Sequence, residues 1–121
     1  MSQGSALYRG DLVIVDFRSV NPSLGVRPAL VLQNDADNAR MLNTIVAQVT
    51  SNVRRAAEPT QLLLDQQHPD WALSGLHRPS VVNCSNIYAV EQKHIARVIG
   101  RLSSTTMLRL GECIKTALGL A

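Results

Sequence analysis

One arginine stands between a loop and a proline in the segment GVRPALV, residues 25–31. Pro28 disfavours a helical backbone at Arg27 and holds it extended, while Gly25 allows the preceding loop to fold back. The guanidinium is a permanent cation whose planar fork matches two phosphate oxygens. Its place at the junction of a rigid strand and a loop is compatible with phosphate binding by Arg27, and a solvated arginine at the start of a strand would have the same local sequence.

Three hydrogen-bonding side chains follow one another where a second apolar run ends. Thr50, Ser51 and Asn52 close the segment TIVAQVTSN, residues 44–52. Hydroxyl groups at the end of a strand can donate hydrogen bonds to phosphate oxygens. The same residue types also form turns without any ligand, so the sequence leaves both interpretations open.

Proton transfer would need further groups, and the candidates are His77, Asp65 and His68. His77 lies just before the run SVVNCS, and an ordinary histidine titrates near neutral pH. Asp65 ends the run QLLLD, but an unshifted aspartate is a weak base. A histidine solvated in a loop would have the same sequence context as His77. No cysteine, histidine or carboxylate cluster has the spacing of metal ligands, so neither a metal nor another cofactor is expected.

The elements that must position these groups are mostly strands. Short runs separated by turn residues predict six strands, and their regular spacing predicts a small barrel or sandwich. Several of the runs are continuously apolar, which predicts burial on both faces. The predicted strands are residues 11–17, 28–33, 44–50, 60–65, 79–85 and 96–102.

Two segments favour helix. A helix is predicted from Ser103 or Ser104 to Leu118, because serine caps an apolar stripe at helical spacing. The members of that stripe are Met107, Leu110, Ile114, Ala117 and Leu118. The segment DADNAR, residues 35–40, could form one helical turn capped by Asn34 or Asp35.

The bulk composition describes one small globular domain. The chain has 121 residues, of which 45% are hydrophobic and 17% charged, and a net charge of +3. Ten of its twelve cationic side chains are arginine, which suits an anionic partner, although a preference for arginine codons would have the same effect. Its two cysteines form no CxxC motif, so a reduced, cytoplasmic compartment is expected. No run is long enough to span a membrane, and residues 1–8 are expected to be frayed.

The order of the motifs resembles that of the MazF/PemK-type toxins. The matching pieces are RGDLVIVDF, GVRPALVLQND, TIVAQVTSN, EPTQLLLD and SVVNCSNIYAV, within residues 9–102. The resemblance implies a small SH3-like (CcdB/PemK-type) antiparallel barrel with a C-terminal helix, which is mostly β in an α+β class and forms a single domain over residues 9–121. It further implies a sequence-specific endoribonuclease that cuts single-stranded mRNA without metal, leaving 2′,3′-cyclic phosphate and 5′-OH ends. Such toxins form homodimers and are neutralised by a cognate acidic antitoxin.

Carried over residue by residue, the resemblance assigns catalytic roles to Arg27 and Thr50. Members with an R-C-D-Q motif would have arginine in place of Asn83 and aspartate in place of Ser85. The identity of the general base is therefore open, and the candidates for this role or for substrate positioning are His77, Asp65, Ser85 and Asn86. The expected RNA-binding residues are Ser51, Asn52, Arg18 and Trp71.

Two alternative functions have to be weighed against the nuclease. A CcdB-like toxin on this barrel would bind and poison a protein such as gyrase, and the missing aspartate favours that alternative. The arginine–proline and threonine–serine motifs favour the nuclease, because poisoning a protein needs no residue that holds phosphate. An SH3-like adaptor would need an aromatic-lined groove. The aromatic residues are too few and too scattered to line one: Tyr8, Phe17, Trp71 and Tyr88.

Overall fold

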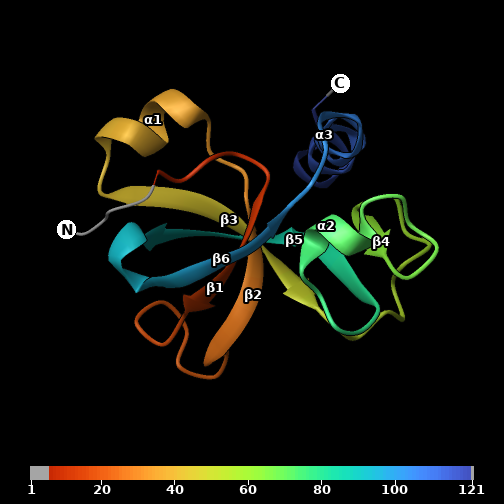
Figure 1. The fold of residues 1–121 in the computed structure, drawn as a ribbon, viewed down its shortest axis with the longest axis horizontal. Coiled ribbons are helices and arrows are strands. Elements are labelled where there is room, and N and C mark those ends of the chain that lie inside the picture. The colour runs from red at the N-terminus through yellow and green to blue at the C-terminus, as the bar shows by residue number, and fades with distance from the viewer. Residues whose placement is uncertain (1–5, 121) are drawn as a thin grey trace.

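The computed structural model describes residues 6–120 and shows one curled, antiparallel sheet with a C-terminal helix (Figure 1). The sheet has six strands in the order β4-β5-β3-β2-β1-β6. The strands are β1 (Asp11–Asp16), β2 (Val26–Val31), β3 (Asn43–Thr50), β4 (Gln61–Leu64), β5 (Ser80–Glu91) and β6 (Ile95–Arg101). The helices are α1 (Asp35–Arg40), α2 (Trp71–Ser74), the 3-10 turn η1 (Gln92–His94) and α3 (Ser104–Leu118).

The sheet carries a hydrophobic core on each face, which confirms the burial predicted from the apolar runs. Side chains alternate along a strand, so Leu12 of β1 belongs to one cluster and Val13 and Val15 to the other. Leu110 and Cys113 of α3 complete the first cluster. The curl of the sheet closes the second cluster around Phe17 and its neighbours. Within the described chain β4 and β6 do not pair with each other, so the predicted barrel is a half-barrel.

The C-terminal helix begins and ends as its sequence predicts. Ser103 is the N-cap, and its hydroxyl accepts a hydrogen bond from the backbone N–H of Thr106. Gly119 ends the helix in the left-handed conformation, as is common at this position. The predicted stripe is buried or half-buried except at its last member, Leu118, which is 58% exposed. Asn34 caps α1, as one of the two alternatives expected.

Two strands differ most from their predicted extents. β2 runs from Val26 to Val31 instead of 28–33, so Arg27 lies inside the strand rather than before it, and Pro28 is not its first residue. Proline is tolerated there because the ladder between β2 and β3 begins only at Ala29, so Pro28 has no partner residue on β3. β5 continues to Glu91, well beyond the predicted end, because β3 also supplies partners for Ile87–Glu91.

The first five residues lie outside the described part of the chain, so the expected frayed start can be followed only from residue 6. Leu7 packs against the second core cluster, and the Tyr8 N–H donates to the Asp11 carboxylate at 2.9 Å. The Arg101 guanidinium lies over the Tyr8 ring. Leu7 and Tyr8 are therefore held against the sheet. None of the helices within residues 6–120 is long and apolar enough to cross a membrane.

Candidate functional site

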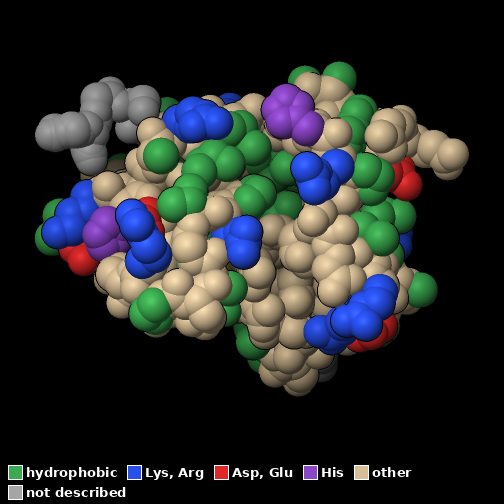
Figure 2. Space-filling model, turned by 90° about the horizontal axis from the view of Figure 1, so that it is seen from below, with side chains coloured by type: hydrophobic (Ala, Val, Ile, Leu, Met, Phe, Trp, Pro, Cys, Tyr) green, Lys and Arg blue, Asp and Glu red, His purple; other side chains and the backbone are tan. Residues whose placement is uncertain are grey.

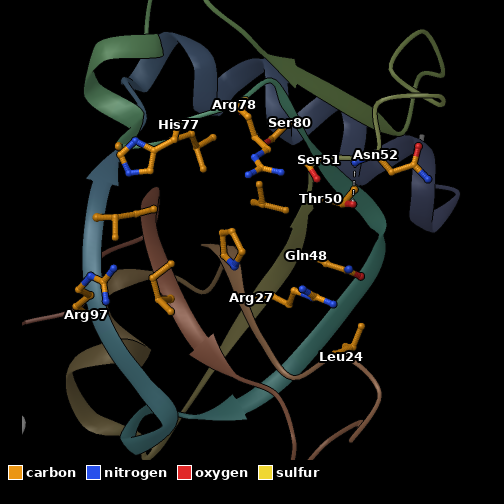
Figure 3. Close-up of a pocket in the computed structure, with 16 residues that line it drawn as sticks. Leu24, Arg27, Gln48, Thr50, Ser51, Asn52, His77, Arg78, Ser80 and Arg97 are labelled. Atoms are coloured by element: carbon orange, nitrogen blue, oxygen red, sulfur yellow. Dashed lines mark hydrogen bonds between the residues drawn. The ribbon is translucent and has the colours of Figure 1, made fainter.

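A cleft of about 510 Å³ opens at one end of the curled sheet. β2, β3, β6 and the loop before β5 all contribute to its wall. In the view of Figure 3, His77 and Arg97 lie on one side of the opening, and Gln48 and Thr50 lie opposite, with Arg27 next to Gln48. Residues that are far apart in the chain thus share one solvent-exposed space.

Arg27 is presented by the pairing of its strand. β2 runs antiparallel to β1, with Arg27 opposite Val15. Gly25 adopts a positive φ of 64°, which turns the loop back, and its carbonyl accepts from the Phe17 N–H at 2.9 Å. The Arg27 side chain is exposed, and no carboxylate of residues 6–120 forms an ion pair with it. Its charge is therefore available to a ligand, as the sequence predicted.

Two further arginines join Arg27 in the cleft, and sequence reasoning missed both. Arg78 lies in the loop before β5, and Arg97 lies on β6. None of the residues that line the cleft is an aspartate or a glutamate. On the face shown in Figure 2, Lys and Arg side chains are spread across the surface, and Asp and Glu side chains lie towards its edges. The positive electrostatic field of such a surface attracts anions. The arginine-rich composition was the only feature of the sequence that indicated it.

Thr50, Ser51 and Asn52 both form a turn and line the cleft, so the two interpretations of this segment are compatible. The Thr50 Oγ1 atom accepts a hydrogen bond from the backbone N–H of Asn52 at 3.1 Å. The Asn52 side chain accepts in turn from the backbone N–H of Arg54 at 3.2 Å. Because Thr50 acts as the acceptor in this turn, its hydroxyl proton is free to be donated to a ligand.

His77 is placed at the cleft by close backbone packing between the end of α2 and β6. Gly75 follows α2 with a φ of 73°, and a Cβ atom there would collide with the Ile99 carbonyl. A Cβ atom on Gly100 would collide with the carbonyls of Leu73 and Ser74. These two glycines bring the loop directly onto β6. His77 is exposed at the edge of this contact and lines the cleft.

A second cleft of about 440 Å³ lies beside the first and shares Gln48, Thr50 and Asn52 with it. Its other lining residues are Arg54, Arg55, Gln61, Asn83 and Asn86. Asn86 comes from the segment in which the family motif places its carboxylate and amide, and its side chain donates to Gln48 Oε1 at 3.0 Å. Ser85 of the same segment is exposed and lines neither cleft.

Besides Ser85, three of the expected site residues lie away from both clefts. The Asp65 carboxylate accepts from the backbone N–H of Gln67 at 3.1 Å, which closes the turn after β4. Trp71 begins α2 and is half-buried. Arg18 donates two hydrogen bonds to Asp16, at 2.9 and 2.6 Å, and these bonds lower the pKa of Asp16 to about 2. Local bonds thus hold Asp65 and Arg18 where they are.

Three other side chains with chemically reactive groups lie outside both clefts and belong to the loop or the core. His68 Nδ1 accepts a hydrogen bond from the backbone N–H of Asp70 at 2.9 Å, so it is part of the loop that leads to α2. Cys84 and Cys113 are free and buried in the first core cluster. Burial, and then the neighbouring Cys113, raise the pKa of the Cys84 thiol to about 12, which leaves it protonated and unreactive.

Comparisons with known proteins agree on one family. The family model described as the PemK-like, MazF-like toxin of type II toxin–antitoxin systems matches residues 8–118. Endoribonuclease EndoA of Bacillus subtilis (strain 168) is 31% identical over 114 residues, covering 93% of this chain and 94% of the relative. Endoribonuclease MazF of Staphylococcus epidermidis is 28% identical over 116 residues, covering 94% and 92%.

Solved structures agree with this result. The Mycobacterium tuberculosis toxin MazF-mt6 is 28% identical, with a TM-score of 0.76 over 92% of this chain and 98% of that one. An endoribonuclease from Mycobacterial species in complex with its cognate antitoxin has a TM-score of 0.75 at 22% identity, over 96% and 98%, and supports the fold alone. From its sequence, its fold and these similarities, this chain belongs to the PemK-like, MazF-like toxins of type II toxin–antitoxin systems.

Proposed function

We propose that this toxin is an endoribonuclease that cuts single-stranded mRNA by a metal-independent mechanism. The observation that carries the proposal is the meeting of Arg27, Thr50 and His77 in one cleft whose lining holds no carboxylate. The relatives named as endoribonucleases support the same activity. A cationic cleft without carboxylates in its lining suits a polyanionic strand, because phosphates dominate the affinity of proteins for nucleic acids.

Arg27 is assigned to the scissile phosphate. Its fork can bind two non-bridging oxygens and stabilise the charge that builds up as phosphorus becomes five-coordinate. Thr50 and Ser51 add neutral hydroxyl donors, and Asn52 lies next to them in the same wall. Arg78 and Arg97 are assigned to neighbouring phosphates, which position the strand.

His77 is the first candidate for the general base. It takes the proton of the ribose 2′-OH, the 2′ oxygen attacks phosphorus, and the bond from phosphorus to the 5′ oxygen breaks. The products are a 2′,3′-cyclic phosphate and a 5′-OH, which takes its proton from water in the open cleft. His77 ranks before Asp65 because it lines the cleft and Asp65 does not. A serine hydroxyl is too weak a base to replace the family aspartate near neutral pH, and Ser85 also points to solvent.

We infer the partners of the toxin from the positive charge of the arginines that line the cleft. An acidic segment of a cognate antitoxin would mimic the RNA backbone and cover Arg27, Arg78 and Arg97. A solved relative of 22% identity is described as bound to its cognate antitoxin. The toxin would act as a homodimer in the cytoplasm, where mRNA is present.

Incubation of the purified protein with single-stranded RNA in excess EDTA tests the proposal. We expect fragments that carry 2′,3′-cyclic phosphate and 5′-OH ends, at a rate unchanged by EDTA. Within residues 6–120 no three His, Cys, Asp or Glu side chains group as metal ligands would. A requirement for added magnesium would contradict the mechanism. Intact RNA in every condition would contradict the nuclease and return attention to a protein target.

A further inference from the structure

Three amide side chains form a row across neighbouring strands beside the Arg27 cleft. Gln48 of β3 lies opposite Asn83 of β5, and Asn83 lies opposite Gln61 of β4. The neighbours of Gln61 and Gln48 in their strands, such as Leu62 and Ala47, pack in the cluster that α3 completes. Because side chains alternate along a strand, the row points away from α3. All three amides line the second cleft.

The hydrogen bonds of this row fix which way its amides point. The backbone N–H of Ser85 can only donate, and it donates to the Asn83 Oδ1 atom at 2.9 Å. The same oxygen accepts from Gln61 Nε2 at 3.0 Å, and Gln61 Nε2 also donates to Thr60 Oγ1 at 2.9 Å. Both protons of the Gln61 amide nitrogen are therefore used, and its Oε1 atom is left as the acceptor.

The Gln61 Oε1 atom has no hydrogen-bond partner among the described residues, although it is buried. The whole residue is only 6% exposed, and Asn83 is only 8% exposed. A buried acceptor without a partner costs about 1–3 kcal/mol, so such groups usually have a role. The Asn83 amide nitrogen makes no hydrogen bond to any residue between 6 and 120 either. An unused acceptor and an unused donor thus belong to two paired residues that both line the second cleft.

We propose that Gln61 and Asn83 form a pocket that reads one base of the RNA, next to the scissile phosphate, and that the base is cytosine or adenine. The inference rests on the proposed function and names what the same site recognises. The two clefts share Gln48, Thr50 and Asn52, so a strand held by Arg27 passes the row of amides. The bases of single-stranded RNA are open to such readout on their Watson–Crick edges.

The pattern of donors and acceptors selects the base. Cytosine and adenine each present an amino group beside an unprotonated ring nitrogen on that edge. The amino group can donate to Gln61 Oε1, and the ring nitrogen can accept from the Asn83 amide nitrogen. Uracil has an imino proton between two carbonyl oxygens, which would bring an acceptor against Gln61 Oε1. Guanine presents a ring N–H beside its amino group, which would face the Asn83 donor.

Cleavage-site mapping on a random single-stranded RNA library tests the pocket, with Gln61→Met as the variant. Methionine has nearly the length of glutamine but makes no comparable hydrogen bonds. We expect the native toxin to prefer cytosine or adenine at one position near the cut, and Gln61→Met to lower that preference about tenfold, as lost base contacts do. Preferences at the other positions should persist. Gln67→Met is the matched control, because Gln67 is exposed and lines neither cleft.

A second variant keeps the test decisive if Gln61→Met is poorly folded. Asn83→Asp preserves the shape and the Oδ1 acceptor but replaces the amide donor by a second acceptor. Guanine presents two neighbouring donors, so we expect the preference at the same position to move from cytosine or adenine to guanine. An unchanged preference in both folded variants would overturn the pocket, while the nuclease assignment would stand.

Binding separates this proposal from the nuclease itself. Fluorescence anisotropy would compare oligocytidylate and oligouridylate of equal length on the native protein, Gln61→Met and Gln67→Met. A cytidylate preference that is lost only in Gln61→Met supports the pocket, even if the native protein leaves every RNA intact. Equal ratios of the two affinities in all three proteins would overturn it.

Discussion

Gln48 of β3 lies opposite Asn83 of β5, whereas Ala47, the residue just before it, lies opposite Ile87. Residues 84–86 of β5 are therefore accommodated in a bulge without partners on β3. Bulges re-aim side chains beside functional sites. Here the bulge turns Asn86 back onto Gln48 and leaves Ser85 in solvent. The segment in which the family motif has its carboxylate thus contributes the amides of Asn83 and Asn86 to the lining of the second cleft, and no carboxylate.

Replacement of Arg27 by alanine should abolish RNA cleavage and toxicity without unfolding the protein. Loss of one preorganised donor of this kind costs about 10²–10³-fold in rate, and the exposed side chain supports no part of the core. The measurement is single-turnover cleavage, together with circular dichroism. Arg40→Ala is the matched control, since Arg40 pairs with Asp37 on α1 and lines neither cleft. More than a tenth of the native rate in a folded Arg27→Ala protein would refute the assignment.

The pH dependence of cleavage should depend on His77. If His77 is the base, activity rises with pH, because only the neutral imidazole can accept the proton of the 2′-OH. His77→Ala should lower the single-turnover rate about 10²-fold or more and remove this acidic limb. Asp65→Ala provides the comparison, because Asp65 lies outside both clefts.

Either of two results would change the choice of base. An unchanged rate and pH profile in His77→Ala would remove His77 from the mechanism. A selective loss in Asp65→Ala, with intact circular dichroism, would move the role to Asp65 and would require the loop after β4 to rearrange when RNA binds.

Acid should destabilise the toxin through Asp70, which ties the loop that carries His77 to α3. Its carboxylate accepts from the Ser103 N–H at 2.8 Å and from the Ser103 hydroxyl at 2.9 Å. Burial by itself would raise the pKa of Asp70, but the hydrogen bonds from Ser103 and Thr106 outweigh it and hold the pKa below 3.8. The stabilisation is therefore complete above the unfolded pKa and is lost as the pH falls through the folded pKa.

Urea unfolding of the native protein and Asp70→Asn checks this linkage between pH and stability. At pH 7 the variant should be less stable by about 1–3 kcal/mol, the range for hydrogen bonds to a charged group and their loss. The difference should shrink as the pH is lowered from 5 to 3. Asp65→Asn, in the turn after β4, serves as the control. If the difference in the free energy of unfolding between the two proteins does not change with pH, the negative charge of Asp70 does not contribute to stability.

The toxin should be a homodimer that an acidic segment of the antitoxin inhibits by covering its RNA cleft. Large apolar side chains such as Leu42 and Leu108 are 85% and 77% exposed in the single chain, and exposed apolar surface of this kind is typical of interfaces. Light scattering at micromolar concentration should give twice the mass of one chain. The antitoxin segment should compete with RNA for native protein and bind Arg27→Ala more weakly. A monomeric mass would contradict the homodimer. Inhibition that leaves RNA binding unchanged would contradict the claim that the antitoxin covers the RNA cleft.

The sequence by itself determined the features that depend on near neighbours. The apolar runs predicted the strands and their burial on two faces, because alternation along a strand is a local property. Ser103 predicted the start of α3 through a bond to a residue three positions away. Pro28 predicted an extended, exposed Arg27. The ordered motifs also indicated the family, which the comparisons confirm.

Only the tertiary structure decided which distant residues share a site. Arg78 and Arg97 join Arg27 because the sheet curls, and Gly75 and Gly100 let α2 and β6 meet closely enough to bring His77 to the same opening. Asp65 was the second candidate for the base in the sequence, but the turn after β4 holds it away from both clefts. Pairing register and bulges depend on packing over the whole sheet rather than on local propensity. For that reason no local pattern could reveal that Gln61 and Asn83 would lie side by side with an unused acceptor between the strands.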